Sequence, residues 1–76
     1  MKSRYPPDVA GLQAYVTDLF DRYKKKRTEI KLRDRHVANK LRIDLAALPG
    51  IQDALNLGDV LSCKRGLTRS VYKIKL

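Results

Sequence analysis

Residues 34–53 have the sequence DRHVANKLRIDLAALPGIQD, and this stretch decides which fold the chain adopts. Apolar and small side chains recur in it at steps of three and four residues, the spacing of one face of an α-helix. These side chains are Val37, Ala38, Leu41, Leu48 and Ile51. The pair Ile43-Asp44 lies between the first three of these side chains and the last two, and it is predicted to form a turn. The stretch therefore predicts two short helices joined by a turn.

The first of these helices is predicted over residues 35–42, with Asp34 as its N-cap, because a short acidic side chain accepts hydrogen bonds from free backbone N–H groups. Pro49 leaves the start of the second helix open, since proline removes one backbone hydrogen bond inside a helix. The second helix starts either at Asp44, which would cap it, or at Leu48 or Pro49 after a loose turn.

On the N-terminal side, residues 1–7 are expected to form a short extended leader that contains two prolines. Residues 8–26 are predicted as a helix that ends in a run of cations, which favours the helix dipole. Its apolar face comprises Val9, Leu12, Val16, Leu19, Phe20 and Tyr23. Gly11 lies inside this helix and costs up to about 1 kcal/mol relative to alanine.

Runs of alternating apolar residues predict three short strands, over residues 28–32, 60–64 and 70–76. Gly58 is expected to end the preceding helix. Residues 65–69 contain a glycine and join the last two strands as a hairpin loop. With only 76 residues, the chain forms a single domain, predicted over residues 8–76.

The formal net charge of +9 is distributed unevenly along the chain. Residues 1–21 carry a net charge of −1 and residues 22–42 carry +8, whereas residues 43–63 carry −3 and contain no lysine or arginine. Residues 64–76 carry +5. Two basic blocks flank a charge-poor segment, which is the distribution expected of a protein that contacts phosphates on two sides of another contact.

The order helix, strand, helix, helix, strand, basic loop, strand resembles that of a winged helix-turn-helix domain, an α+β fold with three helices and a small antiparallel sheet. Residues 34–53 also match the helix-turn-helix pattern position by position. The matching residues are Val37, Ala38, Leu41, Arg42, Ile43, Leu48 and Ile51. Ala38 fits because two steeply crossing helices leave room for a small side chain only. Arg42 departs from the pattern, which usually has glycine at this left-handed turn position.

Over residues 8–76 the chain is similar to the small winged-helix regulators of crenarchaeal viruses and virus–plasmid hybrids. The resemblance implies sequence-specific binding of double-stranded DNA and regulation of transcription, with the second motif helix in the major groove and the hairpin wing on the flanking backbone or minor groove. Whether one copy or a homodimer occupies a DNA site is left open.

Three polar residues of the second motif helix are candidates for contacting bases. Gln52 and Asn56 lie four residues apart, and an amide side chain pairs bidentately with adenine. Asp53 can accept a hydrogen bond from cytosine N4. The candidates for contacting phosphates, in the motif and in the wing, are Arg33, Arg35, Lys40, Arg42, Lys64, Arg65, Thr68 and Arg69. Each of these side chains also has a plainer interpretation as solvated surface.

Other classes of function find little support in the sequence. One cysteine and one histidine are too few for a structural zinc site, and no nucleophile is predicted to lie beside a base, so we expect no enzyme activity, metal or cofactor. No apolar run approaches the ~20 residues that span a bilayer, and a lone cysteine favours a reducing, cytoplasmic setting. The alternatives are an RNA-binding or ribosome-associated module and a winged-helix domain that binds another protein.

Overall fold

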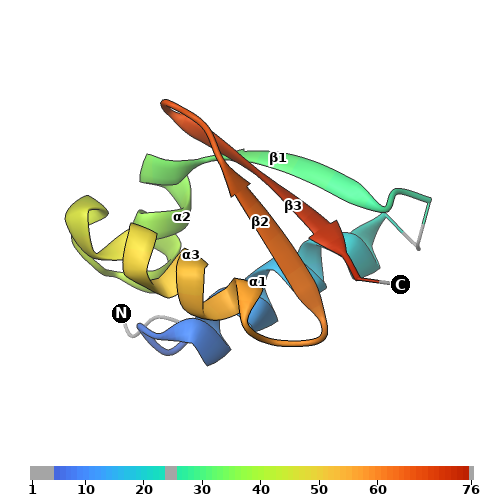
Figure 1. Cartoon of the computed structure of the whole chain (residues 1–76), viewed down its shortest axis with the longest axis horizontal. Helices are drawn as coiled ribbons and strands as arrows, with labels where there is room; N and C mark the ends of the chain where they lie inside the picture. The colour runs from blue at the N-terminus through green and yellow to red at the C-terminus, as the bar shows by residue number, and fades with distance from the viewer. Residues whose placement is uncertain (1–4, 24–25, 76) are drawn as a thin grey trace.

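The computed structural model describes residues 5–23 and 26–75, which form an α+β fold with three α-helices and a three-stranded antiparallel sheet (Figure 1). In chain order the elements are α1 Val9–Arg22, β1 Glu29–Arg33, α2 Asp34–Leu41, the 3-10 helix η1 Leu45–Ala47, α3 Leu48–Asn56, β2 Leu61–Arg65 and β3 Arg69–Ile74. Within the described ranges, no helix has the length and apolar character needed to cross a lipid bilayer.

The strand order is β1-β3-β2, so that β3 lies in the centre and pairs antiparallel with both neighbours. Alternation along the strands turns Ile30, Leu61, Cys63 and Tyr72 toward the helices, where they are buried. The helices lie on this one side of the sheet (Figure 1). The core is completed by side chains of the three helices: Leu12, Tyr15, Val16, Phe20, Val37, Ala38, Leu41, Leu48 and Leu55.

Helix α1 ends at Arg22, four residues before the predicted end, because the chain turns at Tyr23 toward the sheet. Lys26 and Arg27 therefore follow the helix, and Lys24 and Lys25 lie outside the described residues. The Arg27 guanidinium carbon lies 4.6 Å from the centre of the Tyr23 ring, a cation–π contact.

The end of the predicted leader packs against α1 and explains the glycine inside that helix. A Cβ atom on Gly11 would lie 1.7 Å from the carbonyl oxygen of Pro6, so only glycine permits this close approach. The Tyr5 hydroxyl donates a hydrogen bond of 2.7 Å to Asp18, and its ring meets the Tyr15 ring edge-on. Residues 5–7 are thus part of the packed domain rather than an appendage.

Helix α2 begins at Asp34 and not at residue 35, and its N-cap residue is Arg33. The prediction that Asp34 caps this helix is wrong, because its carboxylate accepts hydrogen bonds from a serine and a glutamine of other elements instead. At the other end, Arg42 has φ 55° and ψ 48°, the left-handed conformation expected at the turn position where glycine is usual. The turn is closed by the Ile43 N–H, which donates to the Ala38 carbonyl at 3.0 Å.

The open question about Pro49 is settled by two consecutive helical segments. Residues Leu45–Ala47 form the 3-10 helix η1, and α3 starts directly after it at Leu48. Pro49 lies in the first turn of α3, where its missing N–H has no partner to lose. Asp44 precedes η1, but its side chain makes no capping hydrogen bond.

Candidate nucleic-acid interface

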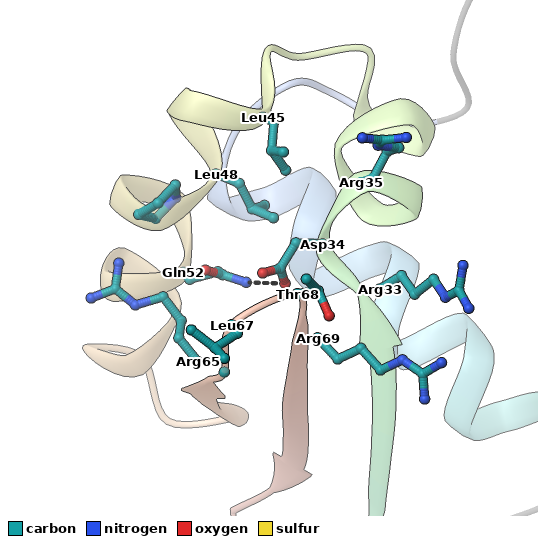
Figure 2. A pocket seen from close by; sticks show the side chains of 12 residues that line it. Arg33, Asp34, Arg35, Leu45, Leu48, Gln52, Arg65, Leu67, Thr68 and Arg69 are labelled. Atoms are coloured by element: carbon teal, nitrogen blue, oxygen red, sulfur yellow. Dashed lines mark hydrogen bonds between the residues drawn. The ribbon is translucent and has the colours of Figure 1, made fainter.

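An open groove of about 750 Å³ lies between the N-terminal end of α3 and the tip of the β2–β3 hairpin, beside the start of α2 (Figure 2). Its apolar wall comes from Leu45, Leu48 and Pro49, and its opposite wall from the hairpin residues 65–69. Four arginines line it: Arg33, Arg35, Arg65 and Arg69. The groove therefore joins the two basic blocks of the sequence in space.

The arginines spread over both sides of the groove. Figure 2 shows Arg33 and Arg69 extending side by side in one direction, whereas Arg65 extends in the other. Arg33 and Arg69 are direct partners in the β1–β3 register. Like charges directly opposite each other destabilise a sheet, so an anion between these two guanidiniums would relieve a repulsion built into the fold.

Few carboxylates oppose these cations. Arg65 makes an ion pair of 3.5 Å with Asp53, and both side chains are about half exposed or more, so the pair contributes little. Arg33, Arg35 and Arg69 make no ion pair with any residue in the described ranges. Three of the four guanidiniums are thus available to an external polyanion.

Gln52 and Asp34 line the groove and belong to a network of polar side chains from α2, α3 and β3 that continues into the core. The Gln52 amide donates to the Ser70 hydroxyl at 3.1 Å, to the Tyr72 hydroxyl at 3.0 Å and, more weakly, to Asp34 at 3.5 Å. The Ser70 hydroxyl donates in turn to the same Asp34 oxygen at 2.6 Å. Burial raises the pKa of the Tyr72 hydroxyl, which therefore stays protonated. This network locks α3 to the sheet and to the start of α2.

Gln52 is a structural residue, and its prediction as a base-contacting residue is wrong. Its side chain is 1% exposed, and its amide nitrogen is bonded within the network. The predicted role of Asn56 meets a similar objection, although the residue lies on the surface. Its amide donates to the Cys63 carbonyl and accepts from the Cys63 N–H, both at 2.8 Å, so its bidentate pattern is already used.

The exposed surface of η1 and α3 therefore differs from the predicted one. Asp53 is exposed there, beside Arg65. Apart from Asn56, the other exposed residues of η1, α3 and its C-cap are small or apolar: Leu45, Ala46, Ala47, Gly50, Ala54 and Leu57. A Cβ atom placed on Gly50 would meet no atom within 4 Å, so this glycine is not required by packing. The surface offers close approach and apolar contact rather than hydrogen-bonded recognition.

The remaining candidates occupy three places. Thr68 lies at the hairpin tip beside the groove, and its carbonyl accepts from the Asp34 N–H at 2.9 Å. Lys40 and Arg42 lie at the far end of α2, roughly 8 and 10 Å along the helix axis from Arg35 at ~1.5 Å per residue. Lys64 points away from the groove, because it alternates with Cys63, which is buried on the helix side of the sheet.

Comparison of the chain with protein-family models, with curated proteins and with solved structures found no match. Within the described ranges, no group of three or more histidine, cysteine or acidic side chains is placed to hold a metal ion.

Proposed function

We propose that the protein binds double-stranded DNA as a winged helix-turn-helix domain and thereby regulates transcription. In this proposal α2 and α3 are the two motif helices, and the β2–β3 hairpin is the wing. The observation that carries the proposal is the arginine-lined groove between the N-terminus of α3 and the hairpin tip. Regulation of transcription follows from the resemblance of residues 34–53 to the helix-turn-helix pattern.

The electrostatic part of the proposal rests on the arginines without acidic partners. If Arg33, Arg35, Arg65 and Arg69 each neutralise one phosphate, the logarithm of the affinity should fall with the logarithm of the salt concentration at a slope of about −3.6, since each contact contributes ~0.9. Lys40 and Arg42 at the end of α2 would steepen this slope if the duplex extends along the helix.

Base recognition in this proposal comes from close apolar contact. The exposed face of α3 has small side chains and no amide free for pairing with a base, and Asp53 is the one acidic group there. Alanine side chains contact the methyl group of thymine, and the shape of the duplex adds a preference that needs no base contact. Sequence preference should therefore be modest and centred on A·T-rich steps.

Titration of fluorescent duplexes by anisotropy, at several salt concentrations, tests the proposal. The variant Arg35→Gln/Arg65→Gln should weaken binding to all duplexes and flatten the salt slope by about 1.8, for two lost contacts. The matched control Arg22→Gln/Lys26→Gln removes the same charge from the end of α1 and the residues after it, away from the groove lining. Equal effects of the two variants would show that the groove is not the binding site.

The exposed surface of η1 and α3 favours one second candidate function, the binding of another protein. Leu45 is 49% exposed and Leu57 is 88% exposed, among small residues that would allow a helix to pack closely. Leu57→Ser changes an exposed residue outside the groove lining, so it should then weaken a protein complex detected by analytical ultracentrifugation and leave DNA affinity intact. Duplex RNA of the same sequence serves as a third ligand, and tighter binding to RNA than to DNA would favour the RNA-binding alternative.

A further inference from the structure

The face of the sheet that points away from the helices is strongly basic. Its side chains are those that alternate with the buried ones along each strand. They are Glu29, Lys31 and Arg33 from β1, Ser62 and Lys64 from β2, and Arg69, Val71 and Lys73 from β3. This surface thus carries five cations and one carboxylate, and no described helix covers it.

The cations form a regular array across the three strands. Lys31 and Lys64 lie on either side of Val71 in the sheet register, two strand spacings or roughly 10 Å apart. Lys31 and Arg33 are two residues apart on β1, a step of roughly 7 Å. Among the described residues, the carboxylate of Glu29 pairs only with Lys73, at 3.3 Å. Lys31, Arg33, Lys64 and Arg69 make no ion pair with any other described residue.

This face meets the groove at Arg33 and Arg69, and its other cations extend away from the groove. Lys64 and Arg65 are neighbours on β2 but lie on opposite sides of the sheet, with Arg65 toward α3 and its partner Asp53. Lys73 is four residues from the hairpin-proximal Arg69, roughly 13 Å along β3. A duplex seated in the groove would therefore leave Lys31, Lys64 and Lys73 pointing away from it. A shallow hollow of about 400 Å³ lies on this face next to Lys64 and Lys73.

The chemistry of the face indicates the kind of ligand. It contains no aromatic side chain on which a base could stack, and stacking is the main contact of single-strand binders. Rows of lysine and arginine at these spacings instead suit phosphates, which a protein contacts without regard to base sequence. The duplex backbone fits this surface better than an unpaired strand does.

We propose that this outer face of the sheet binds the phosphate backbone of a second DNA duplex, so that one copy of the protein bridges two duplex segments. The bridge rests on the proposed function, because the first segment occupies the groove. Arg33 and Arg69, at the boundary of the two surfaces, lie where they can contact either segment.

An NMR titration of the ¹⁵N-labelled protein with a 12-base-pair duplex separates the two surfaces. Amides around the groove, such as those of Arg35 and Gly66, should shift and saturate near one equivalent of duplex. Amides of Lys31 and Lys73 should shift as a second, weaker event between one and four equivalents. If the chemical shifts of the Lys31 and Lys73 amides do not change, or saturate together with those of the groove amides, the second site does not exist. If only the groove signals stay still, the proposed function fails instead.

A bridging assay provides the functional readout, in which an immobilised duplex and the protein retain a labelled second duplex. Lys31→Gln/Lys73→Gln should reduce this retention strongly and flatten its salt slope by about 1.8, while the anisotropy titration of a single duplex at low protein concentration stays unchanged. The control Arg22→Gln/Lys26→Gln removes equal charge and should retain bridging. Unchanged retention by Lys31→Gln/Lys73→Gln would overturn the proposal.

Discussion

Replacing Gln52 by alanine should destabilise the fold and, under the proposed function, leave the DNA preference of the folded protein unchanged. The substitution removes two buried hydrogen bonds, to Ser70 at 3.1 Å and to Tyr72 at 3.0 Å, and leaves the Tyr72 hydroxyl without its amide donor. A buried polar group that loses its partner costs ~1–3 kcal/mol, so we expect a loss of about 3 kcal/mol once the truncated volume is included.

That loss is large for a chain of 76 residues, whose total stability is roughly 4–11 kcal/mol at ~0.05–0.15 kcal/mol per residue. The melting temperature should fall by about 12–24 °C, at ~4–8 °C per kcal/mol for a domain of this size. Circular dichroism melts and urea titrations measure the change. Asp53→Ala serves as the control, because it alters the adjacent, exposed side chain and removes only a weak ion pair.

Below its melting temperature, the Gln52→Ala variant should bind cognate and random duplexes as the parent does. A variant that melts within a few degrees of the parent, and that has lost its preference among duplexes, would refute the assignment. Gln52 would then act as a base-contacting residue, and the polar network would not hold in solution.

Four further predictions concern single sites. Arg42→Gly should raise the free energy of unfolding, measured by urea titration, by about 1 kcal/mol, because φ is 55° at this position and glycine adopts this left-handed conformation without strain. An unchanged value would argue against the left-handed turn. Gly50→Ala should stabilise α3 by ~0.5–1 kcal/mol, because the new methyl group meets no protein atom. The same methyl group would project from α3 toward the proposed duplex and weaken DNA binding, so an unaltered affinity would place α3 away from the duplex. Gly11→Ala should lower the melting temperature, at a cost of about 2 kcal/mol, because its Cβ atom would collide with the Pro6 carbonyl. Burial raises the pKa of the Cys63 thiol, so its reaction with a disulfide reagent at pH 8 should be far slower than in urea; equal rates would contradict its burial.

The two helices of residues 34–53 and the turn between them were predictable because their signals are local. The spacing of Val37, Ala38 and Leu41 indicates a helix face, and all three side chains are buried. The left-handed turn position falls on Arg42, as the pattern requires. The strands were predictable for the same reason, since alternation alone places Cys63 and Tyr72 in the core. The predicted boundaries of the elements differ from the observed ones where tertiary contacts determine them. One example is α1, which ends at Arg22 and not at residue 26.

The candidate site was predicted less well, because the partners of polar side chains are distant in sequence. Gln52 lies four residues after Leu48 and three before Leu55, so its spacing already placed it on the buried face of α3. Its polar side chain favoured a position on the surface. The local sequence does not show that the hydroxyl groups of Ser70 and Tyr72 would accept hydrogen bonds from its amide inside the core. The charge pattern predicted phosphate contacts on two sides of another contact, and this stays a prediction. Arginines from both basic blocks line the groove.

The hydrogen bonds of Asn56 have a consequence for how the protein behaves at high concentration. β2 is an edge strand, and the outward backbone N–H and carbonyl of an edge strand can pair with a strand of another molecule. The Asn56 amide occupies this pair of groups at Cys63, much as the peptide group of an added strand would. One surface side chain therefore closes the middle of the edge to sheet extension, and so helps a concentrated solution of the protein to resist aggregation.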